Sequence, residues 1–309
     1  MLALSIIVPL YNEAENIQPL YERLKGVVTQ LGVSHEFVFI NDGSHDATIA
    51  LVHEIAARDE AVKFIDFSRN FGHQIAVTAG LDRAVGDAVV IIDADLQDPP
   101  ELILEMYAKM QSGYEVVYAK RRKREGESWL KKLTAKYFYR ILKSITSVEI
   151  PVDTGDFRIM DRKVVDVLKQ MPEHHKFLRG QISWIGFQQT YVEYDRDERN
   201  AGETGYTYRK MLKFALDGIT AFSDFPLKLA TITGFIVSGI SFVVLLYALY
   251  IRLIKEIHEP GWTSIIVSVL FLGGVQLISI GVIGEYISRI NSEVKNRPLY
   301  IVRDTNIEE

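Results

Sequence analysis

The sequence predicts an α/β protein in which a doubly wound, mostly parallel sheet is followed by two membrane-spanning helices. Within the first 120 residues, short apolar runs alternate with helical segments, and the run AVVII at residues 88–92 is apolar throughout. Strands of a parallel sheet read this way because helices cover both faces. Two long uncharged segments near the C-terminus predict the membrane helices.

The expected elements follow in β-α-β-α order, which is typical of doubly wound folds. Strands are expected at residues 4–8, 36–40, 62–67, 88–92 and 115–119. Helices are expected at residues 16–31, 47–58, 73–84 and 100–111. The opening residues MLALSIIVPLYNE have no basic start, and Pro9 shortens their apolar run, so they are interpreted as a strand and not as a signal peptide.

The composition restricts the possible functions. A net charge of −5 over 309 residues argues against general nucleic-acid binding. The absence of cysteine excludes disulfides and thiolate metal sites, which fits a cytosolic catalytic part.

The two uncharged segments are residues 229–251 and 261–284, of 23 and 24 residues. Each is long enough to cross a bilayer as a helix; a buried helical hairpin in a soluble protein is the alternative. By the positive-inside rule, the domain before them and the tail after them are expected to be cytoplasmic. The basic residues that decide this flank the pair: Arg209, Lys210, Lys213 and Lys228 before it, Arg289, Lys295, Arg297 and Arg303 after it, against only Arg252 and Lys255 in the connecting loop.

Four consecutive strands end in polar residues: PLYNEAEN, NDGSHDAT, SRNFGH and DADLQDPP. Each is followed by a helix N-terminus, which favours anions, and ligands of open α/β sheets bind at this edge. Ordinary turn and capping residues are the alternative interpretation. His73 is interpreted as a helix-start residue, and His174 and His175 as loop residues, because none has metal-ligand spacing.

Asp93 and Asp95 need a separate explanation, because carboxylates repel a bound anion. A divalent cation between them and a diphosphate removes the conflict, and Mg²⁺ or Mn²⁺ suits oxygen ligands. The chain has no Walker loop and no G-x-G-x-x-G motif, so the usual ATP and NAD sites are not indicated.

Several motifs together resemble a known family. They are SIIVPLYNEAENI, FINDGSHDAT, DADLQDPPE, VDTGDFRIMDR and RNAGETGYTYRKMLKFALDGITAFSDFPLKLA, followed by two spans. This order resembles the family 2 inverting glycosyltransferases with the A-type nucleotide-sugar (Rossmann-like) fold. More closely, it is similar to bacterial polyprenyl-phosphate glycosyltransferases, relatives of dolichyl-phosphate mannose synthase.

The resemblance implies a role for each matching residue. It implies that Asp156 faces the acceptor near the anomeric carbon and that Arg199 reaches the phosphates, with Tyr206 closing the same loop. GETGY departs from the more frequent GESK, so a lysine often found in that loop is missing. The implied donor-binding residues are Pro9, Tyr11, Glu13, Asp42 and Asp93, and the implied Mg²⁺ or Mn²⁺ ligands are Asp93, Asp95 and Gln97.

Residues 120–143 carry ten basic residues against two glutamates, with apolar residues at helical spacing. This pattern is typical of a helix on an anionic membrane surface, although a solvated face packed on the protein's own sheet is the alternative. Arg121 and Arg124 are candidate clamps for a lipid phosphate, because a guanidinium matches phosphate geometry. The expected organisation is a cytoplasmic domain (1–206), an interfacial helix (207–228), two spans (229–284) and a cytoplasmic tail (285–309).

The expected function is metal-dependent, inverting transfer of a hexose, with glucose from UDP-glucose favoured by resemblance, to polyprenyl phosphate such as undecaprenyl phosphate. The expected location is the cytoplasmic face of the inner (plasma) membrane, with several membrane passes. Another sugar or a hydroxyl acceptor, and a non-catalytic nucleotide-sugar-binding scaffold, are the alternatives. Gly274 and Gly281 lie on one face of the second span, so a homo-oligomer is expected. Processive synthesis is not indicated. GQISWIG around Trp184 is similar to the Q-x-x-R-W motif of processive polysaccharide synthases but lacks its arginine.

Overall fold

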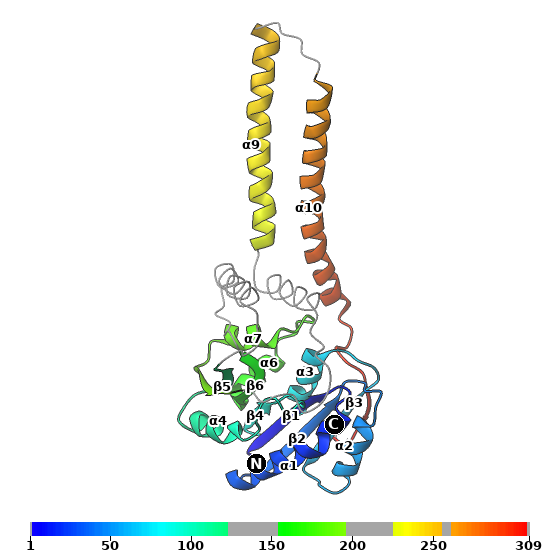
Figure 1. Cartoon of the computed structure of the whole chain (residues 1–309), viewed down its shortest axis with the longest axis vertical. Helices are drawn as coiled ribbons and strands as arrows, with labels where there is room; N and C mark the ends of the chain where they lie inside the picture. The colour runs from blue at the N-terminus through cyan, green and yellow to red at the C-terminus, as the bar shows by residue number, and fades with distance from the viewer. Residues whose placement is uncertain (1, 123–153, 196–224, 255–260, 308–309) are drawn as a thin grey trace.

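The computed structural model describes residues 2–122, 154–195, 225–254 and 261–307. One eight-stranded sheet has the order β7-β5-β6-β4-β1-β2-β3-β8 (Figure 1). The strands are β1 (Leu4–Leu10), β2 (His35–Asn41), β3 (Val62–Phe67), β4 (Ala88–Ile91), β5 (Val116–Arg121), β6 (Thr154–Asp161), β7 (Gln189–Tyr194) and β8 (Val302–Thr305).

Helices cover both faces of this sheet, as the predicted doubly wound fold requires. One apolar core lies under α1 (Ala14–Leu31), α2 (Thr48–Ala56) and α4 (Leu102–Gln111). The other lies under α3 (His73–Arg83), α6 (Arg162–Lys169) and α7 (Leu178–Ile185). Neighbouring β1 residues divide between them, Ile6 in the first core and Ile7 in the second, because successive strand side chains point to opposite faces.

All five predicted strands and all four predicted helices are present, with ends that shift by at most two residues. The sheet is mixed, and four of its seven pairings are parallel, so the predicted mostly parallel sheet is confirmed by a narrow majority. The pairings β4–β6, β5–β6 and β3–β8 are antiparallel. All three antiparallel pairings involve β6 or β8, strands that the alternating pattern did not indicate. In the order of the sheet, β6 lies between β4 and β5.

The two predicted membrane segments fall within α9 (Phe225–Ile254) and α10 (Trp262–Lys295), which project side by side away from the sheet (Figure 1). Both helices are long and apolar enough to cross a membrane, over Phe225–Val244 and Phe271–Lys295. Neither candidate window is buried inside the protein, unlike the core helix of a soluble protein. Most of the predicted interfacial helix at 207–228, and the basic segment from residue 123 onward, lie outside the described residues.

Residues 296–307, which we call the C-terminal strap, return from α10 to the sheet. There, β8 pairs antiparallel with β3, and the Tyr300 ring stacks on Phe67 with centroids 5.0 Å apart. The Tyr300 hydroxyl donates to Asp82 Oδ2 in α3 at 3.1 Å. Upstream of the strap, His174 Nδ1 lies 3.0 Å from Glu293 Oε2 near the end of α10. Residues 293–307 are thus tied to the domain at several points.

Candidate active site

The loops after β1 and β2 are joined at the carboxyl edge of the sheet. The backbone N–H of Glu13 donates to Thr48 Oγ1 at 2.9 Å, and Glu13 precedes the first residue of α1. Pro9 is buried within β1, whereas the Tyr11 side chain is exposed and meets the ring of His45 edge to face at 6.5 Å. Of the predicted donor-binding residues, Tyr11 therefore presents an accessible aromatic surface, and Pro9 shapes the strand beneath it.

Asp42, at the end of β2, is almost fully buried and fixes the β3–α3 loop. Its Oδ1 accepts the Phe71 N–H at 2.6 Å and its Oδ2 accepts the Gly72 N–H at 3.0 Å. Burial raises the pKa of Asp42, and these two hydrogen bonds partly offset the rise. Next to it, Gly43 has φ +67°, and a Cβ there would lie 2.5 Å from the backbone carbonyl carbon of Arg69. The two loops therefore pack backbone against backbone.

The acidic pair follows β4, as predicted. The Asp93 side chain is 29% exposed, whereas Asp95 is buried and its Oδ1 accepts the Gln97 N–H at 3.2 Å. Burial raises the pKa of Asp93 to about 6; His73 opposes the rise, and neighbouring carboxylates, Asp156 first, add to it. Such crowding of carboxylates is what a divalent cation relieves, and the oxygen donors suit Mg²⁺ or Mn²⁺.

A complete protein cage for a metal is not present in the part of the chain that the structure describes. No group of three or more His, Cys, Asp or Glu side chains there could hold an ion. The predicted ligand set of Asp93, Asp95 and Gln97 is consistent with this finding, because Mg²⁺ and Mn²⁺ commonly take only one or two carboxylates together with substrate phosphates. The residues therefore fit a cation that arrives with a diphosphate.

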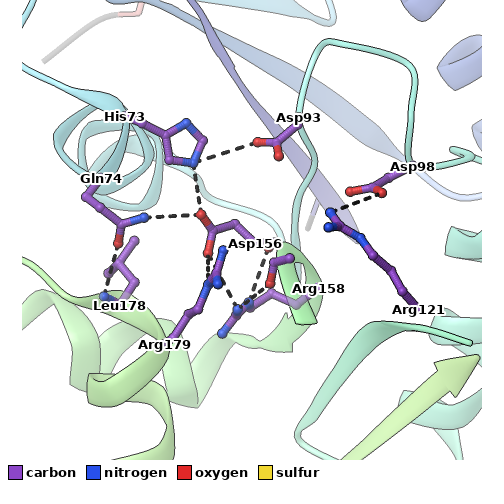
Figure 2. Close-up of polar contacts among 10 residues, drawn as sticks. His73, Gln74, Asp93, Asp98, Arg121, Asp156, Arg158, Leu178 and Arg179 are labelled. Atoms are coloured by element: carbon purple, nitrogen blue, oxygen red, sulfur yellow. Dashed lines mark hydrogen bonds and ion pairs between the residues drawn. The ribbon is translucent and has the colours of Figure 1, made fainter. Parts of the chain in front are cut away.

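Asp156 lies beside the acidic pair because of the β4–β6 register. Ile91 pairs with Arg158, so two residues further along each antiparallel strand Asp93 comes opposite Asp156. Asp156 Oδ1 accepts a hydrogen bond from Arg179 Nε at 2.7 Å (Figure 2). Burial alone would raise the pKa of Asp156, but Arg179 and His73 hold it well below its usual value. Asp156 is therefore a buried, permanently ionised carboxylate at neutral pH.

His73 joins the two acidic groups, which the sequence interpretation did not anticipate. It is the first residue of α3, as predicted, but its Nε2 lies 3.0 Å from Asp156 Oδ2 and 3.7 Å from Asp93 Oδ1 (Figure 2). Burial lowers its pKa, but the hydrogen bond to Asp156 and the charge of Asp93 prevail and raise the pKa of His73 to about 9. The only signal in the sequence was its place at a strand end, in SRNFGH.

Arg121, a predicted phosphate clamp, is engaged within the protein. Its Nε donates to the Tyr194 hydroxyl at 3.2 Å, and its Nη2 lies 3.8 Å from Asp98 Oδ1. The Tyr194 hydroxyl donates in turn to Asp98, which is almost fully buried. A Cβ on Gly155 would lie 3.3 Å from Arg121 Nη2, so this guanidinium packs closely against the start of β6. The other predicted phosphate-binding residues, Arg124 and Arg199, lie outside the described residues, as does Tyr206.

Comparisons with known proteins identify the family of this chain. The family model of glycosyl transferase family 2 matches residues 5–168. An uncharacterized glycosyltransferase of Bacillus subtilis is 56% identical over 97% of this chain and 93% of its own length. A prophage-derived bactoprenol glucosyl transferase of Shigella flexneri is 45% identical over 98% of each chain.

Among solved structures, glucosyl-3-phosphoglycerate synthase from Mycobacterium tuberculosis, in complex with Mn²⁺, UDP and phosphoglyceric acid, is 18% identical. The similarity covers 71% of this chain and 76% of that one, with a TM-score of 0.48. The family model and the closely similar full-length relatives confirm the predicted A-type fold. The chain therefore belongs to glycosyl transferase family 2.

Proposed function

We propose that the protein transfers glucose from UDP-glucose to a polyprenyl phosphate. The observation that carries the proposal is the meeting of Asp93 and Asp156 at one sheet edge, in a chain that continues into two apolar helices. A sugar diphosphate held at Asp93 then presents its anomeric carbon toward Asp156, and the apolar helices suit a lipid acceptor. Relatives of 43–45% identity over 97–98% of the chain, named as bactoprenol glucosyl transferases or a homolog of one, support this choice of sugar and acceptor.

The donor diphosphate is assigned to the acidic edge. Asp93 and Asp95, with Gln97, would hold Mg²⁺ or Mn²⁺, which when bound neutralises charge on the leaving diphosphate. Tyr11 and Glu13 would line the nucleotide side, with Pro9 beneath them. Asp42 would act there by holding the β3–α3 loop, since both of its carboxylate oxygens accept backbone N–H groups.

The proposed reaction is a single in-line displacement with inversion. A phosphate oxygen of the lipid forms a bond to the anomeric carbon as the bond from that carbon to the UDP oxygen breaks, and UDP leaves with the electron pair. The transition state has oxocarbenium character, as in glycoside hydrolysis. A phosphate monoester is largely ionised at pH 7 and needs no strong base. The low pKa of Asp156 suits this, because a weak base can still orient the acceptor and stabilise the positive sugar.

The proposed location is the cytoplasmic face of the plasma membrane, with α9 and α10 as two passes. The charge distribution supports this, because Lys228 in the first turn of α9, Arg289 and Lys295 in the last turns of α10, and Arg297 just after it lie at the ends assigned to the cytoplasmic side by the positive-inside rule. Gly274 and Gly281 permit close helix contacts, so we extend the proposal to self-association within the membrane.

Transfer of labelled glucose tests the proposed function. The full-length protein in detergent or vesicles is incubated with UDP-[¹⁴C]glucose and a short-chain polyprenyl phosphate, with Mn²⁺, Mg²⁺ or chelator. Metal-dependent label in the organic phase is expected with UDP-glucose. No label is expected there when labelled GDP-mannose is the donor. Label that enters a polyprenol without phosphate equally well, or donor binding without any lipid product, would contradict the acceptor assignment. Equal transfer in the presence of chelator would contradict the metal assignment.

A further inference from the structure

His73 occupies an unusual place between the two acidic groups of the site. One ring nitrogen, Nε2, lies 3.0 Å from Asp156 and 3.7 Å from Asp93 (Figure 2). Both neighbours are carboxylates and accept hydrogen bonds, so this nitrogen must carry a proton and donate it. The imidazole therefore connects the side of the site assigned to the donor with the side assigned to the acceptor.

The position of the ring is set by the backbone before it. His73 opens α3 directly after Gly72, whose φ is +105°, a conformation that favours glycine. The N–H groups of Phe71 and Gly72 are held by the two carboxylate oxygens of Asp42. The end of β2 thus fixes the start of α3, and with it the place from which the imidazole reaches the site.

Asp156 also has partners on α3 and α7. Gln74 Nε2 donates to Asp156 Oδ2 at 3.2 Å, and Gln74 Oε1 accepts the Leu178 N–H at 3.2 Å. Arg179, also on α7, donates to Asp156 Oδ1. These contacts orient Asp156 relative to α3 and α7. The contact from His73 to Asp93 connects Asp156, through the imidazole, to the end of β4.

We propose that His73 is a positioning residue for glycosyl transfer, holding Asp156 and Asp93 at a fixed separation so that acceptor and donor meet in line. This inference rests on the proposed function. It concerns alignment and not donor affinity, because His73 acts through the two carboxylates. Loss of the imidazole would let Asp156 turn with Arg179 and Gln74 while Asp93 follows the metal and the diphosphate.

Two substitutions in the full-length protein test the role. His73→Ala removes the bridge, whereas His73→Gln keeps an N–H donor at a similar reach from the backbone. His53→Ala is the matched control, since its imidazole is 44% exposed against 43% for His73 and faces Asp304 at 3.6 Å, away from the site. For each variant we would measure kcat, KM for UDP-glucose, binding of UDP with Mn²⁺ by calorimetry, and Tm.

The expected result for His73→Ala is a kcat about 100-fold lower, since a misplacement of about 1 Å has an effect of this order. KM and UDP affinity should change by less than about threefold, because ground-state binding is retained. Tm of His73→Ala should fall by a few degrees, because the contacts of the imidazole with Asp156 and Asp93 are lost, so kcat is compared well below the Tm of every variant. The His53→Ala control should match the wild-type kcat, and His73→Gln should recover most of the lost kcat.

A His73→Ala variant with near-normal kcat, a loss confined to KM, or a His73→Gln variant as impaired as His73→Ala would overturn the positioning role. A kcat that returns to near the wild-type value when the assay temperature is lowered well below Tm would also overturn it, in favour of a structural role. Failure of the proposed function is distinguishable, because the wild type itself would then give no labelled lipid.

Discussion

The active-site edge and the C-terminal strap lie at different places on one sheet and are organised by opposite principles. At the edge, Asp93 and Asp156 are held close together, and burial among carboxylates raises the pKa of Asp93. In the strap, Tyr300 stacks on Phe67 and Arg303 lies 3.5 Å from buried Asp66, so opposite charges and apolar surfaces are matched. At the edge, the raised pKa of Asp93 shows an unfavourable interaction that is retained at the site of the chemistry. The contacts of the strap, in contrast, favour the folded state. Substitutions should therefore separate activity from stability.

The largest effect is expected for Asp93→Asn. Transfer should fall by at least about 100-fold, because a charged ligand of the diphosphate-bound metal is lost. Tm at pH 7 should stay equal or rise, because a carboxylate whose pKa is raised to about 6 by burial is replaced by a neutral amide. Labelled-lipid synthesis and thermal unfolding measure the two responses.

Asp59→Asn is the matched control, because its carboxylate is stabilising. Burial alone would raise its pKa, but bonds from Lys25 and Tyr21 lower the pKa of Asp59 to about 2. This stabilisation is present above the unfolded pKa of 3.8 and is lost as the pH falls through about 2. Asp59→Asn should therefore lower Tm at pH 7 with little change in transfer. A lower Tm for Asp93→Asn would refute the contrast between the two carboxylates.

Gly43→Ala tests whether the edge depends on the backbone contact between two loops. Its φ of +67° is unfavourable for alanine, and the added Cβ would meet the Arg69 backbone at 2.5 Å. We expect a loss of about 3 kcal/mol in unfolding free energy and about 10-fold in transfer, because the loop that carries Asp42 must shift. Denaturant unfolding and the transfer assay give both values.

Gly32→Ala is its control, since Gly32 has a similar φ of +64° but nothing within 4 Å of an added Cβ. It should cost only about 1 kcal/mol, the conformational part, and leave transfer unchanged. Equal effects of the two substitutions would show that loop packing at Gly43 is unimportant.

The prediction of the fold from sequence succeeded where neighbours in the chain are neighbours in the sheet. The strands β1 to β4 alternate with helices, and their carboxyl ends gather Tyr11, Asp42 and Asp93 at one edge. By contrast, β6 enters the sheet between β4 and β5 by antiparallel pairing, which no local period reveals. β8 is short, only VRDT, with every residue exposed and no apolar alternation. Its pairing with β3 bridges more than 230 residues of sequence.

The residues of the site also divide into those that the sequence predicted and those that it did not. Asp93, Asp95 and Asp156 carry motifs that stand out in the sequence, and the structure brings Asp93 and Asp156 within reach of one imidazole. His73 was assigned only to a helix start, because its partners lie 20 and 83 residues away and a histidine alone has no distinctive spacing. Likewise, the basic pattern made Arg121 a candidate clamp, but could not reveal its partners Asp98 and Tyr194.

Tyr300→Ala tests the strap by removing its aromatic contact. The stack on Phe67 and the hydrogen bond to Asp82 would both be lost. We expect about 2 kcal/mol of destabilisation and a Tm lower by about 5 °C. Tyr300→Phe keeps the stack and should lose only about 1 kcal/mol. Transfer well below Tm should be unchanged in both. A large loss of transfer without a fall in Tm would mean that the strap belongs functionally to the edge.

The smallest effect, and the most specific, is expected for His174→Gln. In the folded protein His174 Nδ1 lies 3.0 Å from Glu293 Oε2, and Nε2 lies 2.8 Å from the Arg297 carbonyl oxygen. Hydrogen bonding to Glu293, then to that carbonyl, raises the pKa of His174, while burial and the charge of Lys176 oppose the rise. A raised pKa stabilises the folded state below the unfolded value of 6.5, and this contribution is lost as the pH rises through the folded pKa.

His174→Gln should therefore lower Tm by about 2 °C at pH 6, a shift typical of a partly exposed ion pair, and by progressively less as the pH is raised above 6.5. The adjacent and exposed His175 contacts Glu293 through its backbone N–H, which glutamine retains, so His175→Gln provides the control at each pH. A Tm difference that stays constant from pH 6 to about pH 9 would assign the effect of His174 to packing and not to its charge. A difference that disappears would establish that α10 is held to the catalytic domain by a protonated imidazole, a link that weakens as the pH rises.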